Sequence, residues 1–315
     1  MTPAIDASAV VPATFLFCPG NRPDRYDKAL RSGAPGIIID LEDAVPDADK
    51  TSARRDAFAW LAGRAALRDS GAASKASSAD NSTDVPGSDP VGSNRLTRPV
   101  VALRISSPMT PAGLEDLYAF VHAEPMPALH AIVLPKVADA TEVRLLASQL
   151  LRAAPALRLI PLIETPQGVR SVAEIARAHP AVAAIGFGAA DYCVEAGIAF
   201  AWEALLHVRS RLAFDCAGTD VPLLDVPFLD LADDAGLRDE CARVKALGFA
   251  GKLAIHPSQV APILQSFAPS PAEAAWANRV VAGFEAAGRR ACTVDGKMVD
   301  EPVYLNALRI TRRAV

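Results

Sequence analysis

Two carboxylates stand close behind short apolar runs that are neighbours in the chain: Glu164 follows residues 159–163, and Asp191 follows residues 183–187. If both runs are parallel strands, the carboxylates reach the same edge of the sheet. Two hard oxygen ligands with room left for water and substrate oxygens are typical of a Mg²⁺ site, and Mn²⁺ accepts similar ligands. One such carboxylate alone more often forms a salt bridge or caps a helix, but the matched placement of the pair favours a metal site.

Arg104 stands near the end of the apolar run 100–105. A guanidinium in that position can bind a substrate carboxylate through two parallel hydrogen bonds. An ion pair with the acidic cluster Asp40, Glu42 and Asp43 is the structural alternative, and both roles can hold at once. Three carboxylates within four residues need a nearby cation, so we expect this cluster to hold metal-bound water or to orient Arg104.

Two further polar residues follow apolar runs. Lys136, behind residues 131–134, could form a Schiff base, but a role as the cation that partners these acids in the second shell is favoured. His256 could act as a general base, and a hydrogen-bonding role at a helix start beside Ser258 is at least as well supported. The segment Gly186-Phe187-Gly188 lacks the third glycine and the context of a dinucleotide fingerprint, so a Rossmann site is excluded.

Short β-branched runs alternate with longer segments of helical period, which is typical of parallel strands joined by crossover helices. Nearly every run ends on a polar or special residue, as expected if the strand ends meet on one rim of a (β/α)₈ TIM barrel. An open doubly wound sheet is the alternative. The seventh run is the weakest because two prolines crowd it. The eight candidate strands are residues 14–18, 36–40, 100–105, 131–134, 159–163, 183–187, 221–225 and 251–255.

The domain organisation follows from the same pattern. We expect a flexible N-terminus over residues 1–13 and one barrel over residues 14–270. Residues 69–98, rich in Ser, Ala, Gly, Asp and Asn, are interpreted as a mobile surface insertion rather than a linker, because strand–helix units continue on both sides. Residues 271–315 are predicted to form a C-terminal helical extension that packs on a neighbouring subunit.

Composition excludes several classes of protein. The chain has 315 residues, is 51% hydrophobic and carries a net charge of -4 with its basic residues scattered, so nucleic acid is not an expected partner. Its five cysteines include no Cys-x-x-Cys pair and are expected to be reduced thiols. The N-terminal stretch has no basic region ahead of apolar residues, and no apolar run approaches membrane-spanning length. We therefore expect a cytoplasmic protein without a membrane partner.

Seven motifs follow one another along the chain, from about residue 14 to residue 310 apart from the insertion. The motifs are Phe17-Cys18-Pro19-Gly20-Asn21-Arg22-Pro23, Ile39-Asp40-Leu41-Glu42-Asp43-Ala44-Val45, Leu134-Pro135-Lys136, Ile163-Glu164-Thr165, Gly188-Ala189-Ala190-Asp191, Ile255-His256-Pro257-Ser258-Gln259 and Gly296-Lys297-Met298-Val299-Asp300. In this order they resemble the citrate lyase β-subunit-like CoA-ester lyases of the HpcH/HpaI aldolase family.

The resemblance implies a TIM barrel of the phosphoenolpyruvate/pyruvate type, usually a homotrimer, that binds Mg²⁺ and cleaves malyl-CoA-like thioesters. It implies metal ligation by Glu164 and Asp191 and binding of the substrate's carboxylate and oxo group by Arg104. It also implies the CoA contacts and an acid/base residue that enters the site of an adjacent subunit. The CoA contacts are Lys28, with Arg22 or Arg25 nearby, and the backbone of Leu253 and Ala254; the acid/base residue is Asp300.

The predicted function is a Mg²⁺-dependent carbon–carbon lyase. It cleaves a 3-hydroxy-3-carboxyacyl-CoA, such as malyl-, citramalyl- or citryl-CoA, to an acyl-CoA and a 2-oxo acid such as oxaloacetate, or catalyses the reverse reaction. A CoA-independent 2-oxo-acid aldolase and a non-catalytic barrel subunit remain alternatives, and hydrolysis of the thioester after cleavage is a further variant of the lyase. The chain departs from many relatives at Phe17, where some have tyrosine, and at Ala190, where many have glutamate.

Overall fold

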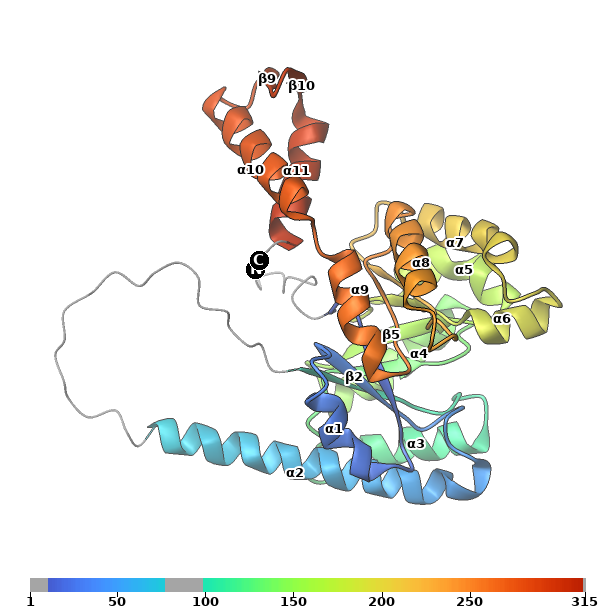
Figure 1. The fold of residues 1–315 in the computed structure, drawn as a ribbon. Helices are drawn as coiled ribbons and strands as arrows, with labels where there is room; N and C mark the ends of the chain where they lie inside the picture. Colours follow the sequence, from blue (N-terminus) through green and yellow to red (C-terminus); the bar gives the residue numbers. More distant parts are fainter. Residues whose placement is uncertain (1–10, 77–98, 314–315) are drawn as a thin grey trace. The chain divides into compact units, whose positions relative to one another are not determined.

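The computed structural model describes residues 11–76 and 99–313 (Figure 1). The chain divides into two compact units, residues 1–263 and 264–315, and each is described by itself. Among the helices of the described residues, none has both the length and the apolar composition needed to cross a bilayer.

The first unit contains eight parallel strands, each paired with the next in chain order. They are β1 (Leu16–Pro19), β2 (Gly36–Asp40), β3 (Val100–Arg104), β4 (Ala131–Leu134), β5 (Arg158–Ile163), β6 (Ile185–Phe187), β7 (Leu223–Asp225) and β8 (Gly251–Lys252). The last strand returns to the first, because the N–H of Phe17 donates to the carbonyl of Ala254 at 2.8 Å and the N–H of Lys252 donates to the carbonyl of Ala13 at 2.9 Å. Sequential order with a closing pair confirms the predicted barrel and excludes an open doubly wound sheet, whose strand order reverses.

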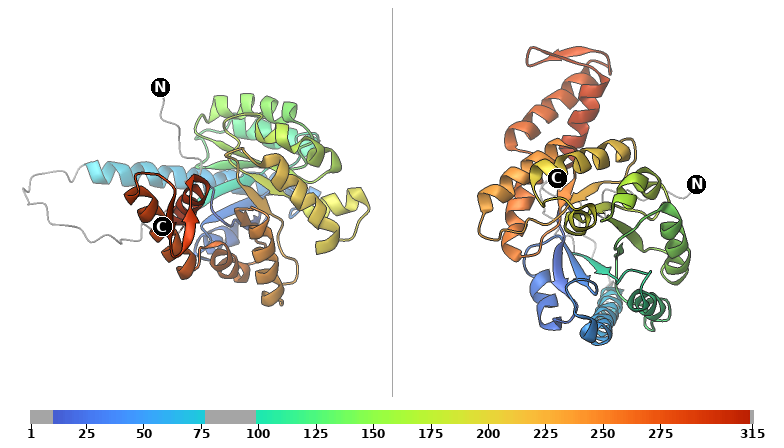
Figure 2. Two further views of the ribbon diagram at one scale, coloured as in Figure 1. Left: turned by 90° about the horizontal axis from the view of Figure 1, so that it is seen from above. Right: turned by 90° about the vertical axis from the view of Figure 1, so that its right-hand side faces the viewer.

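Helices between the strands cover the outside of the barrel (Figure 2). Thr110 and Thr165 each cap a helix that begins with proline, a residue that suits the first helical turn because it lacks an N–H. The helices are α1 (Tyr26–Leu30), α2 (Lys50–Ala76), α3 (Pro111–Val121), α4 (Ala140–Ala153), α5 (Pro166–Ala176), α6 (Ala189–Ala196), α7 (Trp202–Cys216), α8 (Asp234–Ala246) and α9 (Val260–Phe267), with short 3₁₀ turns η2 (Pro23–Arg25), η3 (Asp47–Asp49) and η4 (Pro257–Gln259).

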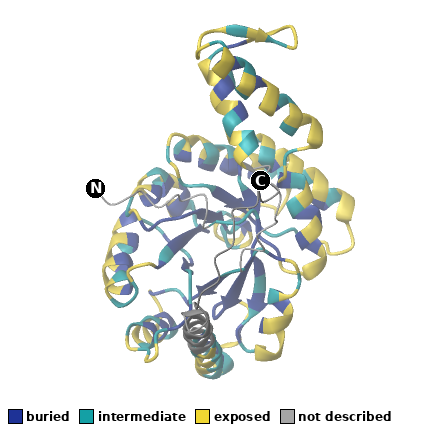
Figure 3. Ribbon diagram, turned by 90° about the vertical axis from the view of Figure 1, so that its left-hand side faces the viewer, coloured by how far each residue is buried: buried dark blue, intermediate teal, exposed yellow. Residues whose placement is uncertain are grey.

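The barrel interior is filled by side chains from alternate strand positions, and the strands are the most buried part of the unit (Figure 3). A filled interior leaves only the ends of the strands for a binding site. The interior cluster consists of Phe15, Ile38, Ala102, Ala131, Val133, Ile160, Leu162, Ala184, Leu224 and Leu253.

A charged network lies between the strands and the outer helices. Asp225, at the end of β7, pairs with Arg209 of α7 at 2.9 Å and with Lys252 of β8 at 2.6 Å. Lys252 also pairs with Glu240 of α8. Asp225 and Lys252 have no exposed side-chain surface, so each depends on the other for compensation of its charge.

The structure adjusts several predicted boundaries. The seventh strand exists but is short, starting at Leu223 after the proline at position 222. Helix α2 continues to Ala76 and so includes the first part of the predicted insertion, because Ala and Lys residues there still favour a helix. The remainder of that insertion, residues 77–98, lies outside the described residues, as do residues 1–10 of the predicted flexible N-terminus.

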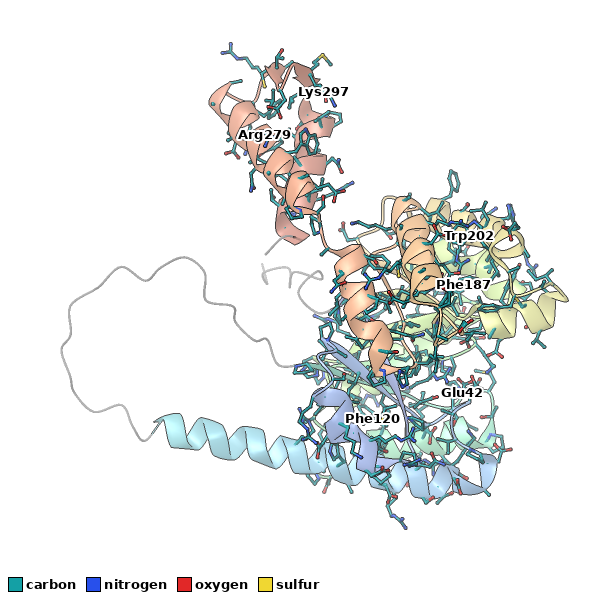
Figure 4. The ribbon with its side chains drawn as sticks, viewed as in Figure 1. Glu42, Phe120, Phe187, Trp202, Arg279 and Lys297 are labelled. Carbon is teal, nitrogen blue, oxygen red and sulfur yellow. The ribbon has the colours of Figure 1, made fainter. Side chains whose placement is uncertain are left out.

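The second unit confirms the predicted C-terminal helical extension. Helices α10 (Pro271–Ala286) and α11 (Glu301–Arg313) are joined by the antiparallel hairpin of β9 (Cys292–Val294) and β10 (Lys297–Val299). The Phe284 and Tyr304 rings stack with centroids 4.8 Å apart. Arg279 of α10 pairs with Asp295 at the hairpin turn, 2.8 Å away, and is labelled in Figure 4.

Candidate active site

The site is built on a buried ion pair at the ends of two neighbouring strands. Asp40 ends β2 and Arg104 ends β3, and the two residues are register partners. Arg104 Nε and Nη2 donate to the two oxygens of Asp40, both at 2.6 Å. The Arg104 guanidinium lies over the Phe17 ring, 5.0 Å from its centroid. The plane of Arg104 is therefore set by a carboxylate on one edge and an aromatic ring on one face.

The acidic loop after β2 reaches the free edge of the same guanidinium. Arg104 Nη1 lies 3.0 Å from Glu42 Oε2 and 3.2 Å from Asp43 Oδ2. Glu42, labelled in Figure 4, is buried, and its Oε2 has an ion-pair distance but no aligned hydrogen bond among the described residues. The Asp43 side chain is 53% exposed. Asp43 is thus the partner of Arg104 that can most easily move aside.

Lys136 connects this loop to the two predicted metal ligands. Its backbone has a φ of 54°, a left-handed conformation that is uncommon for a residue with a side chain. Its N–H donates to Glu164 Oε2 at 2.8 Å. Its ammonium lies 2.7 Å from Glu42 Oε1 and 3.1 Å from Asp191 Oδ2. One residue therefore contacts the carboxylates that follow β2, β5 and β6.

Glu164 is 3% exposed and packs against Gly188, a position with no room for a side chain. A Cβ at Gly188 would lie 2.4 Å from Glu164 Oε1 and 2.3 Å from its Cγ. Burial and the nearby charge of Glu42 raise the pKa of Glu164 to about 8. Asp191, by contrast, lies in the first turn of α6 with its side chain 40% exposed.

The site carries more negative than positive charge, and a divalent cation would offset the excess. Among the described residues, the five carboxylates of the site contact two cations, Arg104 and Lys136, while the nearby Lys50 donates to backbone carbonyls; three negative charges of the cluster are therefore unpaired when all groups are ionised. The carboxylates are Asp40, Glu42, Asp43, Glu164 and Asp191. No group of three or more His, Cys, Asp or Glu side chains within the described part of the chain is arranged to hold a metal. Two carboxylates with water and substrate completing the shell match the preference of Mg²⁺.

The raised pKa of Lys136 separates two of its predicted roles. Burial lowers its pKa, but the hydrogen bond and charge of Glu42 and the charge of Glu164 raise it more, so the net pKa lies above the ordinary value. A Schiff-base lysine needs a neutral amine. The structure therefore supports the interpretation of Lys136 as the cation that partners the acids.

Other candidate residues within the described part of the chain take no part in the ion pairs of this cluster. Lys28 is exposed on α1, and Arg22, also exposed, pairs with Asp24 at 3.0 Å. Leu253 and Ala254 are buried, and their N–H groups donate to the backbone carbonyls of Asp225 and Phe15 as part of the barrel.

Two residues prove to be helix caps. His256 accepts the N–H of Ser258 at the start of η4, so the hydrogen-bonding alternative describes its observed contacts. Asp300 belongs to the second unit, where its carboxylate accepts the N–H of Val303 at 3.2 Å.

Sequence reasoning missed Lys50, which supports the acidic loop. Its ammonium donates to the carbonyls of Leu41, Glu42 and Val45 at 2.9 to 3.2 Å. A lysine that opens a helix shortly after an acidic cluster was the available signal. The contact with backbone carbonyls, rather than with carboxylates, could not be read from it.

Two apolar hollows elsewhere on the barrel unit do not compete with this site. One, of about 250 Å³, is lined by Phe58, Ala119 and Pro125 of α2 and the α3 region. The other, of about 280 Å³, is lined by Trp202, Phe228 and Glu240. Neither hollow includes Arg104, Lys136 or any of the five carboxylates of the candidate site. Convergent polar groups at the strand ends indicate chemistry better than hollow volume does.

Comparison with known proteins identifies relatives of this chain. The family model described as HpcH/HpaI aldolase/citrate lyase matches residues 13–75 and 95–257. A citrate lyase subunit beta-like protein of Mycobacterium tuberculosis is 32% identical over 95% of this chain and 94% of its own length. A (3S)-malyl-CoA thioesterase of Cereibacter sphaeroides is 31% identical over 96% of this chain and 94% of its own length.

A solved structure is also similar. It is described as the protein CitE of Mycobacterium tuberculosis in complex with magnesium, acetoacetate and coenzyme A. It is 30% identical in sequence, covers 96% of this chain and 97% of its own, and has a TM-score of 0.68.

Proposed function

The chain belongs to the HpcH/HpaI aldolase/citrate lyase family, and from this premise we propose that it is a Mg²⁺-dependent carbon–carbon lyase acting on a 3-hydroxy-3-carboxyacyl-CoA. The observation that carries the proposal is the contact of Lys136 with both Glu164 and Asp191, beside Arg104, at the carboxyl ends of the barrel strands. Active sites of this fold lie at that end.

Glu164 and Asp191 are proposed to hold the metal. Glu164 offers the oxygen that does not accept the Lys136 N–H, and Asp191 offers the oxygen that does not face its ammonium. Bound Mg²⁺ would polarise the hydroxyl and carboxylate oxygens of the substrate as a Lewis acid. The magnesium complex of the solved relative supports Mg²⁺ as the metal.

Arg104 is proposed to bind the substrate's carboxylate and oxo group. Asp40 accepts from Nε and Nη2, so the donor proposed for the substrate is Nη1, which lies 3.0 Å from the buried Glu42 and 3.2 Å from the exposed Asp43. Movement of Asp43 toward solvent would free one hydrogen of Nη1 for the substrate while Glu42 stays in place. A fixed guanidinium then stabilises negative charge that develops on the oxygens during bond cleavage.

Asp300 is proposed to donate the proton that the thioester enolate needs after the carbon–carbon bond breaks, and to reach the site from an adjacent subunit of a homotrimer. Lys28 is proposed to meet the CoA phosphates, with the backbone of Leu253 and Ala254 lining the CoA channel. Exposure of Lys28 on α1 and the coenzyme A complex of the relative support the first of these contacts.

The substrate class is malyl-, citramalyl- or citryl-CoA, which share the hydroxyl, carboxylate and thioester groups that this site would bind. The name of the (3S)-malyl-CoA thioesterase favours one variant, in which water attacks the thioester and free CoA is released. A CoA-independent aldolase would instead act on a 2-oxo acid and an aldehyde.

A single assay separates these reactions. The purified protein is incubated with Mg²⁺ and each of the three CoA esters, and 2-oxo acid, acyl-CoA and free thiol are quantified. A lyase releases 2-oxo acid and acyl-CoA without thiol, and a thioesterase releases thiol. The proposal fails if no 2-oxo acid forms from any ester and Glu164→Ala leaves Mg²⁺ binding unchanged.

A further inference from the structure

Lys136 is the only lysine within the charged cluster described above, and it makes two kinds of contact there. Its backbone N–H holds Glu164, while its ammonium, on a side chain 35% exposed, holds Glu42 and Asp191. Its φ of 54° is left-handed, its N–H donates to Glu164 after β5, and its ammonium contacts Glu42 in the loop after β2. The contact with Asp191 places a positive charge beside a carboxylate that is proposed to bind metal.

The charge balance of the cluster shows how this ammonium affects binding of the metal and of the 2-oxo acid. With Lys136 in place and all five carboxylates ionised, the three unpaired negative charges of the cluster fall to one when a divalent cation binds. Without Lys136, two unpaired negative charges would remain after the cation binds. A site with more negative charge attracts a divalent cation more strongly and repels an anionic 2-oxo acid more strongly.

We propose that Lys136 is a positioning residue that sets the balance between metal and substrate affinity: its ammonium weakens binding of the metal and strengthens binding of the 2-oxo acid anion. This inference rests on the proposed metal site. It concerns a residue that ligates neither group and acts through Asp191 and Glu42.

The first measurement is metal affinity. Mn²⁺ binding to the metal-free protein is followed by the electron paramagnetic resonance of the free ion. Lys136→Met keeps the length of the side chain and removes its charge, and we expect Mn²⁺ to bind about tenfold more tightly. Unchanged or weaker Mn²⁺ binding overturns the inference.

The second measurement is anion affinity. Pyruvate binding in saturating Mg²⁺ is measured by titration calorimetry, and Lys136→Met should bind pyruvate about tenfold more weakly. A general loosening of the site would weaken both ligands. Shifts of metal and anion affinity in the same direction therefore contradict the proposal.

Two companion variants separate the effect of the Lys136 charge from the effect of its backbone N–H. Lys136→Gly retains the N–H that holds Glu164 and adopts a φ of 54° without strain, so it should show the same opposed shifts. Lys136→Arg retains the charge and should remain within about threefold of the parent for both ligands. If Lys136→Gly binds both ligands as the parent does, the ammonium has no role and the inference is wrong.

A matched control removes the same charge from the outside of the barrel. Lys245→Met on α8 should leave both affinities unchanged. Failure of the parent protein to bind Mn²⁺ would overturn the proposed function itself. Mn²⁺ binding that is lost in Glu164→Gln but not tightened in Lys136→Met would overturn only this inference.

Discussion

Asp40 and Arg104 are register partners at the ends of β2 and β3, and they join through two hydrogen bonds of 2.6 Å each. Asp40 is 1% exposed and Arg104 is 8% exposed. This pair connects the architecture of the barrel to the chemistry at its rim, because the same guanidinium is proposed to bind substrate.

Asp40→Asn should destabilise the protein by about 3–5 kcal/mol, because it removes the buried carboxylate that accepts two hydrogen bonds from Arg104. Urea denaturation gives the free energy of unfolding. Asp56→Asn, which removes the exposed partner of Arg55, should change that free energy by less than about 0.5 kcal/mol. Equal effects of the two substitutions would contradict the importance of burial.

Asp191→Asn should weaken Mg²⁺ binding by about 100-fold, since a neutral amide replaces one of two charged ligands. Calorimetric titration with Mg²⁺ measures the change. Glu195→Gln removes a carboxylate from the exposed surface of the same helix and serves as the matched control. Similar Mg²⁺ affinity in both variants would show that Asp191 does not ligate the metal.

The stability of the metal-free protein should fall as the pH rises between 4.5 and about 8 because of Glu164. Its folded pKa is raised above its ordinary value, so the folded state binds the proton more tightly than the unfolded state does across that interval. Unfolding temperatures recorded from pH 5 to pH 8 should show the decline, and Glu164→Gln should flatten it. Added Mg²⁺ should restore stability at the upper end, with release of a proton on binding.

Asp225→Asn should also cost about 3–5 kcal/mol of unfolding free energy, because Lys252 and Arg209 would keep their charges without this carboxylate. Burial raises the pKa of Asp225, but Lys252 and Arg209 lower it below its ordinary value of 3.8. The stabilisation is therefore present at neutral pH and is lost as the pH falls below that value. Asp239→Asn, in an exposed pair with Arg243 on α8, is the control.

Mixing subunits tests the proposed role of Asp300. Asp300→Ala and Arg104→Ala should each be nearly inactive in the lyase assay. When they are unfolded together and refolded as mixed oligomers, some sites receive Arg104 from one subunit and Asp300 from another, so part of the activity should return. Activity that stays at the level of the separate variants would contradict a site shared between subunits.

The sequence by itself determined the barrel and the rim. A β-branched run followed by a polar residue predicts where a parallel strand ends, and the ends of parallel strands must meet on one side. Arg104, Lys136, Glu164 and Asp191 could therefore be grouped before any contact was known. The strand ends β3 to β6 place all four in one cluster.

Only the tertiary structure decided which of these groups touch. Lys136 contacts Glu42 across 94 positions of sequence, and no local pattern specifies such a contact because it depends on strand register and on an uncommon backbone angle. The buried pair of Lys252 and Asp225 has the same origin: two charged strand residues are tolerated there because helices α7 and α8 bring Arg209 and Glu240 to them. Local sequence sets the position of a side chain along a strand, and packing sets its partner.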